Sequence, residues 1–64
     1  MRSGTNVRLV HPVKYWDMEL PTGTEGTVLG TMVDAATVKF LLSKGADPVT
    51  TIRFVRDDDC EVIS

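Results

Sequence analysis

The chain has 64 residues, of which 42% are hydrophobic and 25% charged, and its formal net charge is -2 at pH 7. One domain, residues 1–64, accounts for this length, and a domain so small buries only about 60% of the surface of its unfolded chain. The composition excludes a disordered tail and a membrane-spanning helix, which needs about 20 apolar residues, and the acidic balance disfavours a dedicated nucleic-acid binder.

The first expected element is a half-buried strand over residues 6–11, NVRLVH. Val7 and Leu9 share one face, whereas Arg8 and Val10 share the other. This period of two is typical of a strand with one face in a core.

Residues 12–24 (PVKYWDMELPTGT) combine prolines, a glycine and bulky side chains. This mixture predicts a long structured loop without regular structure. Because Tyr15 and Trp16 are adjacent, we expect one of them to pack inward and the other to face solvent. Gly23 is expected to supply a positive φ in the turn after Pro21.

The next apolar stretch, EGTVLGTMV, predicts a second strand that contains Gly26 and Gly30. These glycines match neither the G-x-G-x-x-G nor the G-x-x-x-x-G-K-[ST] phosphate-binding pattern. They share the phase of Val28 and Met32, so all four residues are expected to point inward. Glycines at inward positions let the strand of a small barrel bend.

Residues 34–48 have two interpretations. Asp34 as an N-cap, Leu41 and Leu42 at helical spacing, Lys44 in a last turn and Gly45 as a C-cap favour a helix at about 35–44, and hence an α+β fold. The alternative that we favour is a strand, ATVKFLL, with two inward residues, Val38 and Phe40, and three outward residues, Thr37, Lys39 and Leu41.

The last part of the chain predicts two more strands. TTIRFVR places Ile52 and Phe54 inward, and its outward residues are expected to be Thr51, Arg53 and Val55. DDD, residues 57–59, predicts a tight turn and not a cation site, since it lacks the alternating ligands of a calcium loop. CEVI then places Cys60 and Val62 inward. Arg8 of the first strand and Glu61 are expected to face each other.

The motifs GTNVRLV, LPTGTEGTV, ATVKF, TTIRFV and DDDCEVI together resemble the small SH3-like domains of bacteria and phages. The resemblance spans residues 4–63 and implies an all-β, five-stranded SH3-like barrel in which the first and last strands pair. VRLVHPVKYW is also similar to the SH3-like subunit IV of photosystem I, and the EVI ending is similar to the variable chain of ferredoxin-thioredoxin reductase. The proline-peptide groove of signalling SH3 domains is not implied, because the ALYDY motif and the paired tryptophans are missing.

Most of the candidate functional residues point to protein docking. Exposed Trp and Tyr side chains carry much of the energy of protein interfaces, and a neighbouring Asp17 and Glu19 would favour a partner with positive charge. The predicted partner-binding residues are Tyr15, Trp16, Asp17 and Glu19 of the loop, with Lys39, Leu41, Arg53 and Val55 of the outward sheet face. We expect a regulatory, inhibitory or accessory subunit that acts on a partner protein.

The alternative is a nucleic-acid module that resembles the SH3-like domains of ribosomal and transcription proteins. It would use Lys39, Arg53 and Arg56. The net negative charge disfavours this alternative, as does the expected lack of an outward aromatic side chain for base stacking.

An enzyme is not expected. Cys60 is predicted to be a small core residue, His11 has no evident group to orient it, and one histidine with one cysteine is too few for a zinc site. We therefore expect no catalytic residues, metal, cofactor, small-molecule substrate or membrane partner. With no secretory signal visible and a single cysteine, the expected location is cytoplasmic.

Overall fold

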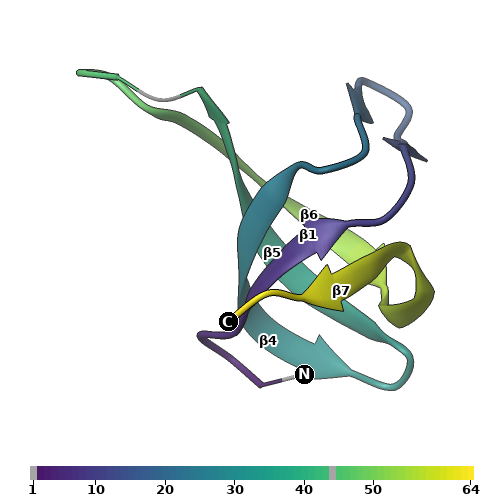
Figure 1. Ribbon diagram of the computed structural model, residues 1–64. Coiled ribbons are helices and arrows are strands. Elements are labelled where there is room, and N and C mark those ends of the chain that lie inside the picture. The colour runs from purple at the N-terminus through teal and green to yellow at the C-terminus, as the bar shows by residue number, and fades with distance from the viewer. Residues whose placement is uncertain (1, 44) are drawn as a thin grey trace.

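A computed structural model describes residues 2–43 and 45–64 and shows an all-β chain (Figure 1). Its main element is a five-stranded antiparallel sheet of strand order β6-β5-β4-β1-β7. In chain order these strands are β1 (Asn6–Leu9), β4 (Glu25–Met32), β5 (Ala35–Ser43), β6 (Val49–Arg56) and β7 (Cys60–Val62). A two-stranded sheet joins β2 (Val13–Lys14) to β3 (Glu19–Leu20), and a 3-10 turn, η1 (Asp57–Asp59), links β6 to β7. The predicted all-β, five-stranded fold is confirmed.

The contested segment is a strand, and the helical alternative is wrong. β5 is hydrogen-bonded to β4 on one side and to β6 on the other, so its backbone groups are satisfied by its neighbours. Asp34, the candidate helix cap, lies in the tight turn before β5 with φ 62, a conformation that Asp tolerates better than most residues. Lys44, the candidate last-turn cation, lies outside the described residues.

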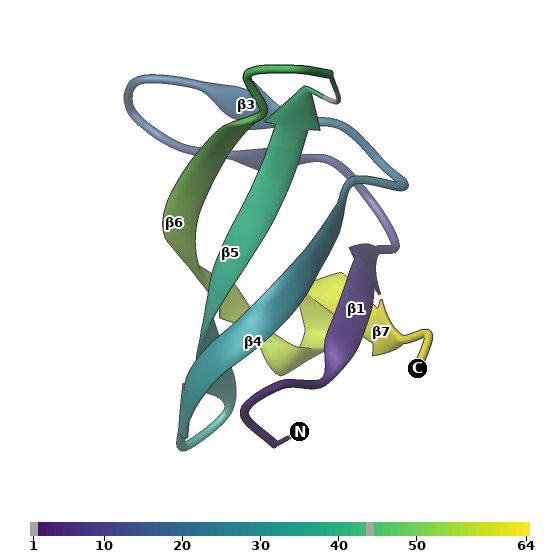
Figure 2. The same cartoon turned by 90° about the vertical axis from the view of Figure 1, so that its left-hand side faces the viewer.

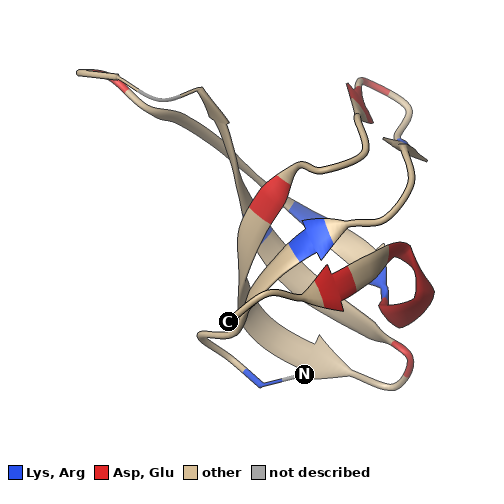
Figure 3. Ribbon diagram, viewed as in Figure 1, with Lys and Arg blue, Asp and Glu red and all other residues tan. Residues whose placement is uncertain are grey.

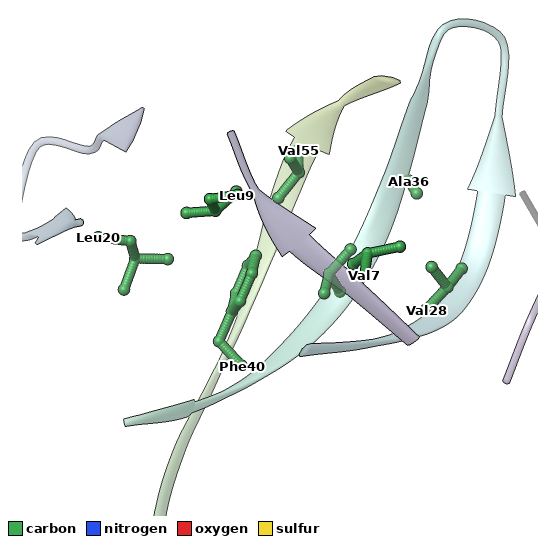
Figure 4. Packing of buried hydrophobic residues seen from close by; sticks show 8 residues of the cluster. Val7, Leu9, Leu20, Val28, Ala36, Phe40 and Val55 are labelled. Atoms are coloured by element: carbon green, nitrogen blue, oxygen red, sulfur yellow. The ribbon is translucent and has the colours of Figure 1, made fainter. Parts of the chain in front are cut away.

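The core lies on the concave side of the curved sheet (Figure 4). Phe40 is its largest side chain and is 0% exposed. The other buried members come from every long strand and from β3: Val7, Leu9, Leu20, Val28, Ala36, Val38 and Val55. The predicted inward phases of β1 and β5 are therefore confirmed, and Leu20 closes one end of the core.

Gly26 lets β4 pass close to β5. A Cβ atom at this position would lie 2.6 Å from Val38 Cγ1 and 2.8 Å from the carbonyl oxygen of Lys39, closer than such atoms approach in proteins. Gly26 thus has the inward role predicted for it. The expectation for Gly30 and Met32 is wrong, because a bulge between Val28 and Gly30 reverses the side-chain phase, which a single extra residue suffices to do.

The predicted phase of β6 is also wrong. Val55 is buried, and Phe54 is 62% and Ile52 57% exposed. The register explains the inversion, since Val55 pairs with Ala36 and Arg53 with Val38, both of them core-facing residues of β5. Phe54 and Ile52 consequently lie on the outer face of the sheet.

The first and last strands pair as expected. Arg8 lies opposite Glu61 in the β1–β7 register, and its Nε donates a hydrogen bond to Glu61 Oε1 at 3.0 Å. Cys60 is partly buried against the core. Val62 is more than half exposed, although it shares the phase of Cys60.

In the described part of the chain, no helix is long and apolar enough to cross a membrane.

Candidate functional site

The segment predicted as an irregular loop contains the small hairpin β2–β3. Val13 pairs with Leu20 and Lys14 with Glu19, so the apolar pair points toward the core and the charged pair toward solvent. The N–H of Tyr15 donates to the carbonyl of Met18 at 2.7 Å and closes the turn. Trp16 and Asp17 are therefore the two residues at the tip of the hairpin.

The hairpin is fastened to β6 by three contacts. The Tyr15 hydroxyl donates to the carbonyl oxygen of Phe54 at 2.6 Å. Arg53 Nη2 lies 2.7 Å from Asp17 Oδ2, with both side chains largely covered, and the Arg53 guanidinium carbon lies 5.3 Å from the centre of the Tyr15 ring. Arg53 Nε also donates to Thr51 Oγ1 at 3.1 Å, which orients the guanidinium toward the hairpin.

The electrostatics of this junction follow from its partial burial. Burial raises the pKa of Tyr15, the positive charge of Arg53 opposes the rise, and the negative charge of Asp59 adds to it. The neutral phenol is thus the form that the fold favours, and it is also the form that donates to Phe54.

Trp16 is the most exposed large apolar side chain of the described residues, at 94%. Its neighbour Tyr15 packs against the core, so the expected division between the two aromatics is confirmed. Asp17 is neutralised by Arg53, contrary to its expected role in attracting a positively charged partner. The exposed charges that remain on the hairpin, Lys14 and Glu19, lie opposite each other and largely cancel.

The predicted outward sheet surface does not exist as one surface. Val55 is in the core, and Arg53 points toward the hairpin on the concave side. Lys39 and Leu41 do lie on the outer face of β5, as expected, and are exposed. The structure therefore brings Arg53 together with Tyr15 and Asp17 and separates it from Lys39.

The outer face instead carries two residues that the sequence analysis placed in the core. Lys39 lies opposite Ile52 and Thr37 lies opposite Phe54, so both β6 side chains stand beside β5. The sequence of β6 is compatible with either face being buried, because Val55 is apolar but lies on the opposite face of the strand from Ile52 and Phe54.

Lys39 and Leu41 also line a hollow of ≈ 570 Å³ on this face. Its walls come from the start of β1, the β3–β4 connection, the start of β4 and the C-terminal residues, and they include Asn6, Pro21, Glu25, Leu42 and Ile63. Thr27 donates to Asn6 Oδ1 at 2.9 Å and Asn6 to Ser64 Oγ at 2.7 Å. The polar side chains of Asn6, Thr27 and Ser64 in the wall are therefore hydrogen-bonded to one another.

His11 does have a partner, contrary to the expectation. Its Nε2 lies 3.0 Å from Asp59 Oδ1, which connects the segment after β1 to η1.

Burial raises the pKa of the Cys60 thiol, which follows Asp59 in the chain, and the charges of Asp57 and Asp59 raise this pKa further. Among the residues that the structure describes, no group of three or more His, Cys, Asp or Glu side chains is placed to hold a metal ion.

Acidic residues gather at one end of the molecule, around η1, β7 and the β4–β5 turn (Figure 3). The backbone holds these segments together, since the N–H of Asp57 donates to the carbonyl of Asp34 at 3.0 Å.

Comparisons with protein-family models, with curated proteins and with solved structures found no match to this chain.

Proposed function

We propose that the protein is a non-enzymatic docking module that binds a partner protein through the tip of the β2–β3 hairpin and acts as a regulatory, inhibitory or accessory subunit. The observation that carries this proposal is the exposure of Trp16, which is 94% exposed. Its two neighbours on the hairpin, Tyr15 and Asp17, both bind to β6. A small domain that leaves its one tryptophan outside the core forgoes the largest burial available to it.

The fixed hairpin lowers the cost of binding through Trp16. Ordering a flexible loop on association costs free energy, and a loop that is already held in place avoids much of that cost. Tyr15 and Asp17, which flank Trp16, are both held by β6. A tryptophan that anchors an interface typically contributes about 2 kcal/mol or more.

The surroundings of Trp16 define the chemistry of the partner site. With Asp17 neutralised by Arg53 and with Lys14 opposite Glu19, the tip has little net charge. The partner is therefore expected to offer an apolar pocket wide enough for an indole, with a hydrogen-bond acceptor for the indole N–H. Electrostatic attraction is expected to add little.

The non-enzymatic part of the proposal rests on the Cys60 thiol. A nucleophilic cysteine needs a lowered pKa, whereas that of Cys60 is raised. Asp59 gives His11 an orienting carboxylate, so the imidazole does not count toward this part of the proposal. A reducing compartment such as the cytoplasm suits a domain without disulfides, and the strand order with the paired first and last strands supports membership of the SH3-like domains of bacteria and phages.

A nucleic-acid module has weaker support. Of its three proposed cations, Arg53 is paired with Asp17 and faces away from Lys39 and Arg56. In its favour, Phe54 supplies the outward aromatic that the sequence analysis did not expect. Titrating a fluorescent single-stranded oligonucleotide at low salt decides this alternative, because phosphate contacts are strongest there.

The docking proposal is tested by affinity capture with the wild-type protein, Trp16→Ala and Val33→Ala. Val33 is the matched control, since it is an 88% exposed apolar residue at the tip of a different turn. We expect Trp16→Ala to lose the captured protein, with binding about 30-fold weaker, and Val33→Ala to retain it. Equal capture by all three proteins would refute the role of Trp16.

A further inference from the structure

β6 is an edge strand, so one side of its backbone has no neighbouring strand (Figure 2). It has 8 residues, a length at which an open edge is a ready template for another strand. Natural proteins usually protect such edges with prolines, lysines or a covering segment. In β6 there is neither a proline nor a lysine, and its one inward-pointing charge, Arg53, is paired with Asp17.

Two hydrogen bonds show which backbone groups of β6 face outward. The N–H of Asp57 donates to the carbonyl of Asp34 across the β5–β6 ladder. In an antiparallel pair, hydrogen-bonded and non-hydrogen-bonded positions alternate. The residues of β6 that direct their backbone groups toward β5 are therefore Val55, Arg53 and Thr51. The carbonyl of Phe54 accepts from the Tyr15 hydroxyl and therefore points away from β5. Both bonds give the same assignment: Thr50, Ile52 and Phe54 present their N–H and C=O groups to the free edge.

The hairpin covers only one part of this edge. Tyr15 occupies the carbonyl of Phe54, and Asp17 holds the neighbouring Arg53. Thr50 and Ile52 lie farther along β6, toward the end at which the β5–β6 hairpin extends as an arm away from the rest of the molecule (Figure 1). Within the described residues, no backbone hydrogen bond from outside the sheet reaches Thr50 or Ile52. Their N–H and C=O groups form an open stretch of edge.

The side chains beside this stretch define what would bind there. Ile52 and Phe54 are more than half exposed, and Leu41 is 39% exposed. The two charged residues on the outer face of β5 and β6 are Lys39 and Arg56, and for neither does the described part of the chain provide an ion pair. This part of the surface is apolar with a positive border at Lys39, whereas Arg56 lies beside the acidic residues of η1.

We propose that the β6 edge binds an extended acidic and apolar peptide segment of a partner protein by strand addition. The N–H and C=O groups of Thr50 and Ile52 would pair with the added backbone, an apolar side chain of the peptide would lie against Ile52 and Phe54, and a carboxylate of the peptide would lie near Lys39. This surface is separate from Trp16.

Charge and geometry favour such a peptide over a second copy of the chain. β6 itself contains two arginines and no acid, so a copy of β6 would not complement the positive border. A copy paired symmetrically about Ile52 would also bring its Thr50 to the Phe54 carbonyl, which Tyr15 already occupies. A nucleic acid would use the cations but not the alternating backbone donors and acceptors.

The test is a nuclear magnetic resonance titration of the 15N-labelled full chain with the synthetic peptide acetyl-Thr-Glu-Val-Glu-Val-Glu-Thr-amide. In the free protein the amides of Thr50 and Ile52 should exchange rapidly with solvent, and those of Thr51, Arg53 and Val55 slowly. On peptide addition, Thr50 and Ile52 should become protected. A peptide with lysine in place of glutamate should bind about tenfold more weakly or worse.

Two blocking changes separate strand addition from surface adsorption. Methylating the backbone nitrogens on one edge of the peptide, but not those on the other, should abolish protection. Ile52→Pro removes an edge N–H that β5 does not use, so it should abolish binding, while Trp16→Ala should leave it unchanged. If Ile52→Pro does not fold, the methylated peptides give the same discrimination.

Several results would overturn the proposal: unchanged binding of both methylated peptides, equal binding of the lysine peptide, or no protection of Thr50 and Ile52. Concentration-dependent dimerisation that protects these amides without peptide would assign the edge to a second copy. Displacement of the peptide by a single-stranded oligonucleotide that binds more tightly at low salt would assign it to nucleic acid.

Discussion

The hydroxyl of Tyr15 donates a hydrogen bond to the carbonyl oxygen of Phe54 over 2.6 Å, and this bond joins a hairpin tip to the edge strand 39 residues later in the chain. The same bond occupies the edge carbonyl of Phe54 and leaves Trp16 as the exposed aromatic of the hairpin. The position of the docking residue and the extent of the open edge therefore both depend on Tyr15.

Replacing Tyr15 with Phe should release the hairpin while keeping the ring that packs on the core. The loss of one partly exposed hydrogen bond should lower the free energy of unfolding by about 0.5–1 kcal/mol. Chemical denaturation followed by circular dichroism measures this change. Trp16 should also become more mobile, and an unchanged fluorescence anisotropy would argue against a fixed hairpin.

The partial burial of Tyr15 predicts a loss of stability at alkaline pH. The pKa of Tyr15 in the folded chain is raised above its usual value of 10.0, so the folded state holds the phenol proton more tightly than the unfolded state does. The contribution of Tyr15 is therefore complete below pH 10 and decreases as pH rises through the folded pKa. Denaturation curves between pH 8 and 11 should show the wild type approaching Tyr15→Phe, and a constant difference would contradict this assignment.

Gly26 and Gly30 form a matched pair in one strand. Gly26→Ala places a methyl group against Val38 and the backbone of Lys39 and should cost about 1–3 kcal/mol, as overpacking usually does. Gly30→Ala meets nothing within 4 Å and has no positive φ, so it should be neutral or slightly stabilising. Thermal melts of the two variants measure the difference, and similar melts would contradict the described approach of β4 to β5.

The two phenylalanines should differ in the same way. Phe40→Ala empties the centre of the core and should cost about 3–5 kcal/mol, which is comparable to the whole stability of a small domain. Phe54→Ala removes an exposed side chain and should cost no more than about 1 kcal/mol. Circular dichroism should show Phe40→Ala largely unfolded and Phe54→Ala folded, and the reverse result would restore the phase predicted from the sequence.

Cys60 should react slowly with alkylating reagents. Burial and the charges of Asp57 and Asp59 raise its pKa, so little thiolate is present at pH 8. Alkylation with iodoacetamide followed by mass spectrometry should be slower for the folded chain than for the urea-unfolded chain, and Asp57→Asn should speed it. A rate above that of the unfolded chain would indicate an activated thiol and weaken the non-enzymatic proposal.

The strands and the core of β1 and β5 were predictable because their buried residues fall on one phase. In β1 the buried residues are Val7 and Leu9, and in β5 they include Val38 and Phe40. Each pair has a spacing of two, which identifies one face of its strand as the buried one. In β6 both phases carry apolar residues, and size favoured Ile52 and Phe54. The actual phase follows from the register with β5, in which Val55 lies opposite Ala36, and local periodicity does not contain this pairing.

The candidate site was predictable in part. The adjacent Tyr15 and Trp16 identified the docking segment, but their sequence does not say which one faces solvent. The tertiary bond to Phe54 decides this, as the bulge after Val28 decides the phase of Gly30 and Met32. Both depend on pairing partners that lie elsewhere in the chain.

The central claim is that Trp16 enters a pocket on a partner protein. The chain has a single tryptophan, so incorporating 5-fluorotryptophan places one 19F label at this position, and a partner without the label adds no signal. When the captured partner is titrated in, we predict a large change in the 19F shift and protection from a soluble paramagnetic quencher. A 19F signal that keeps its free shift and its full quencher sensitivity at saturating partner would contradict the claim.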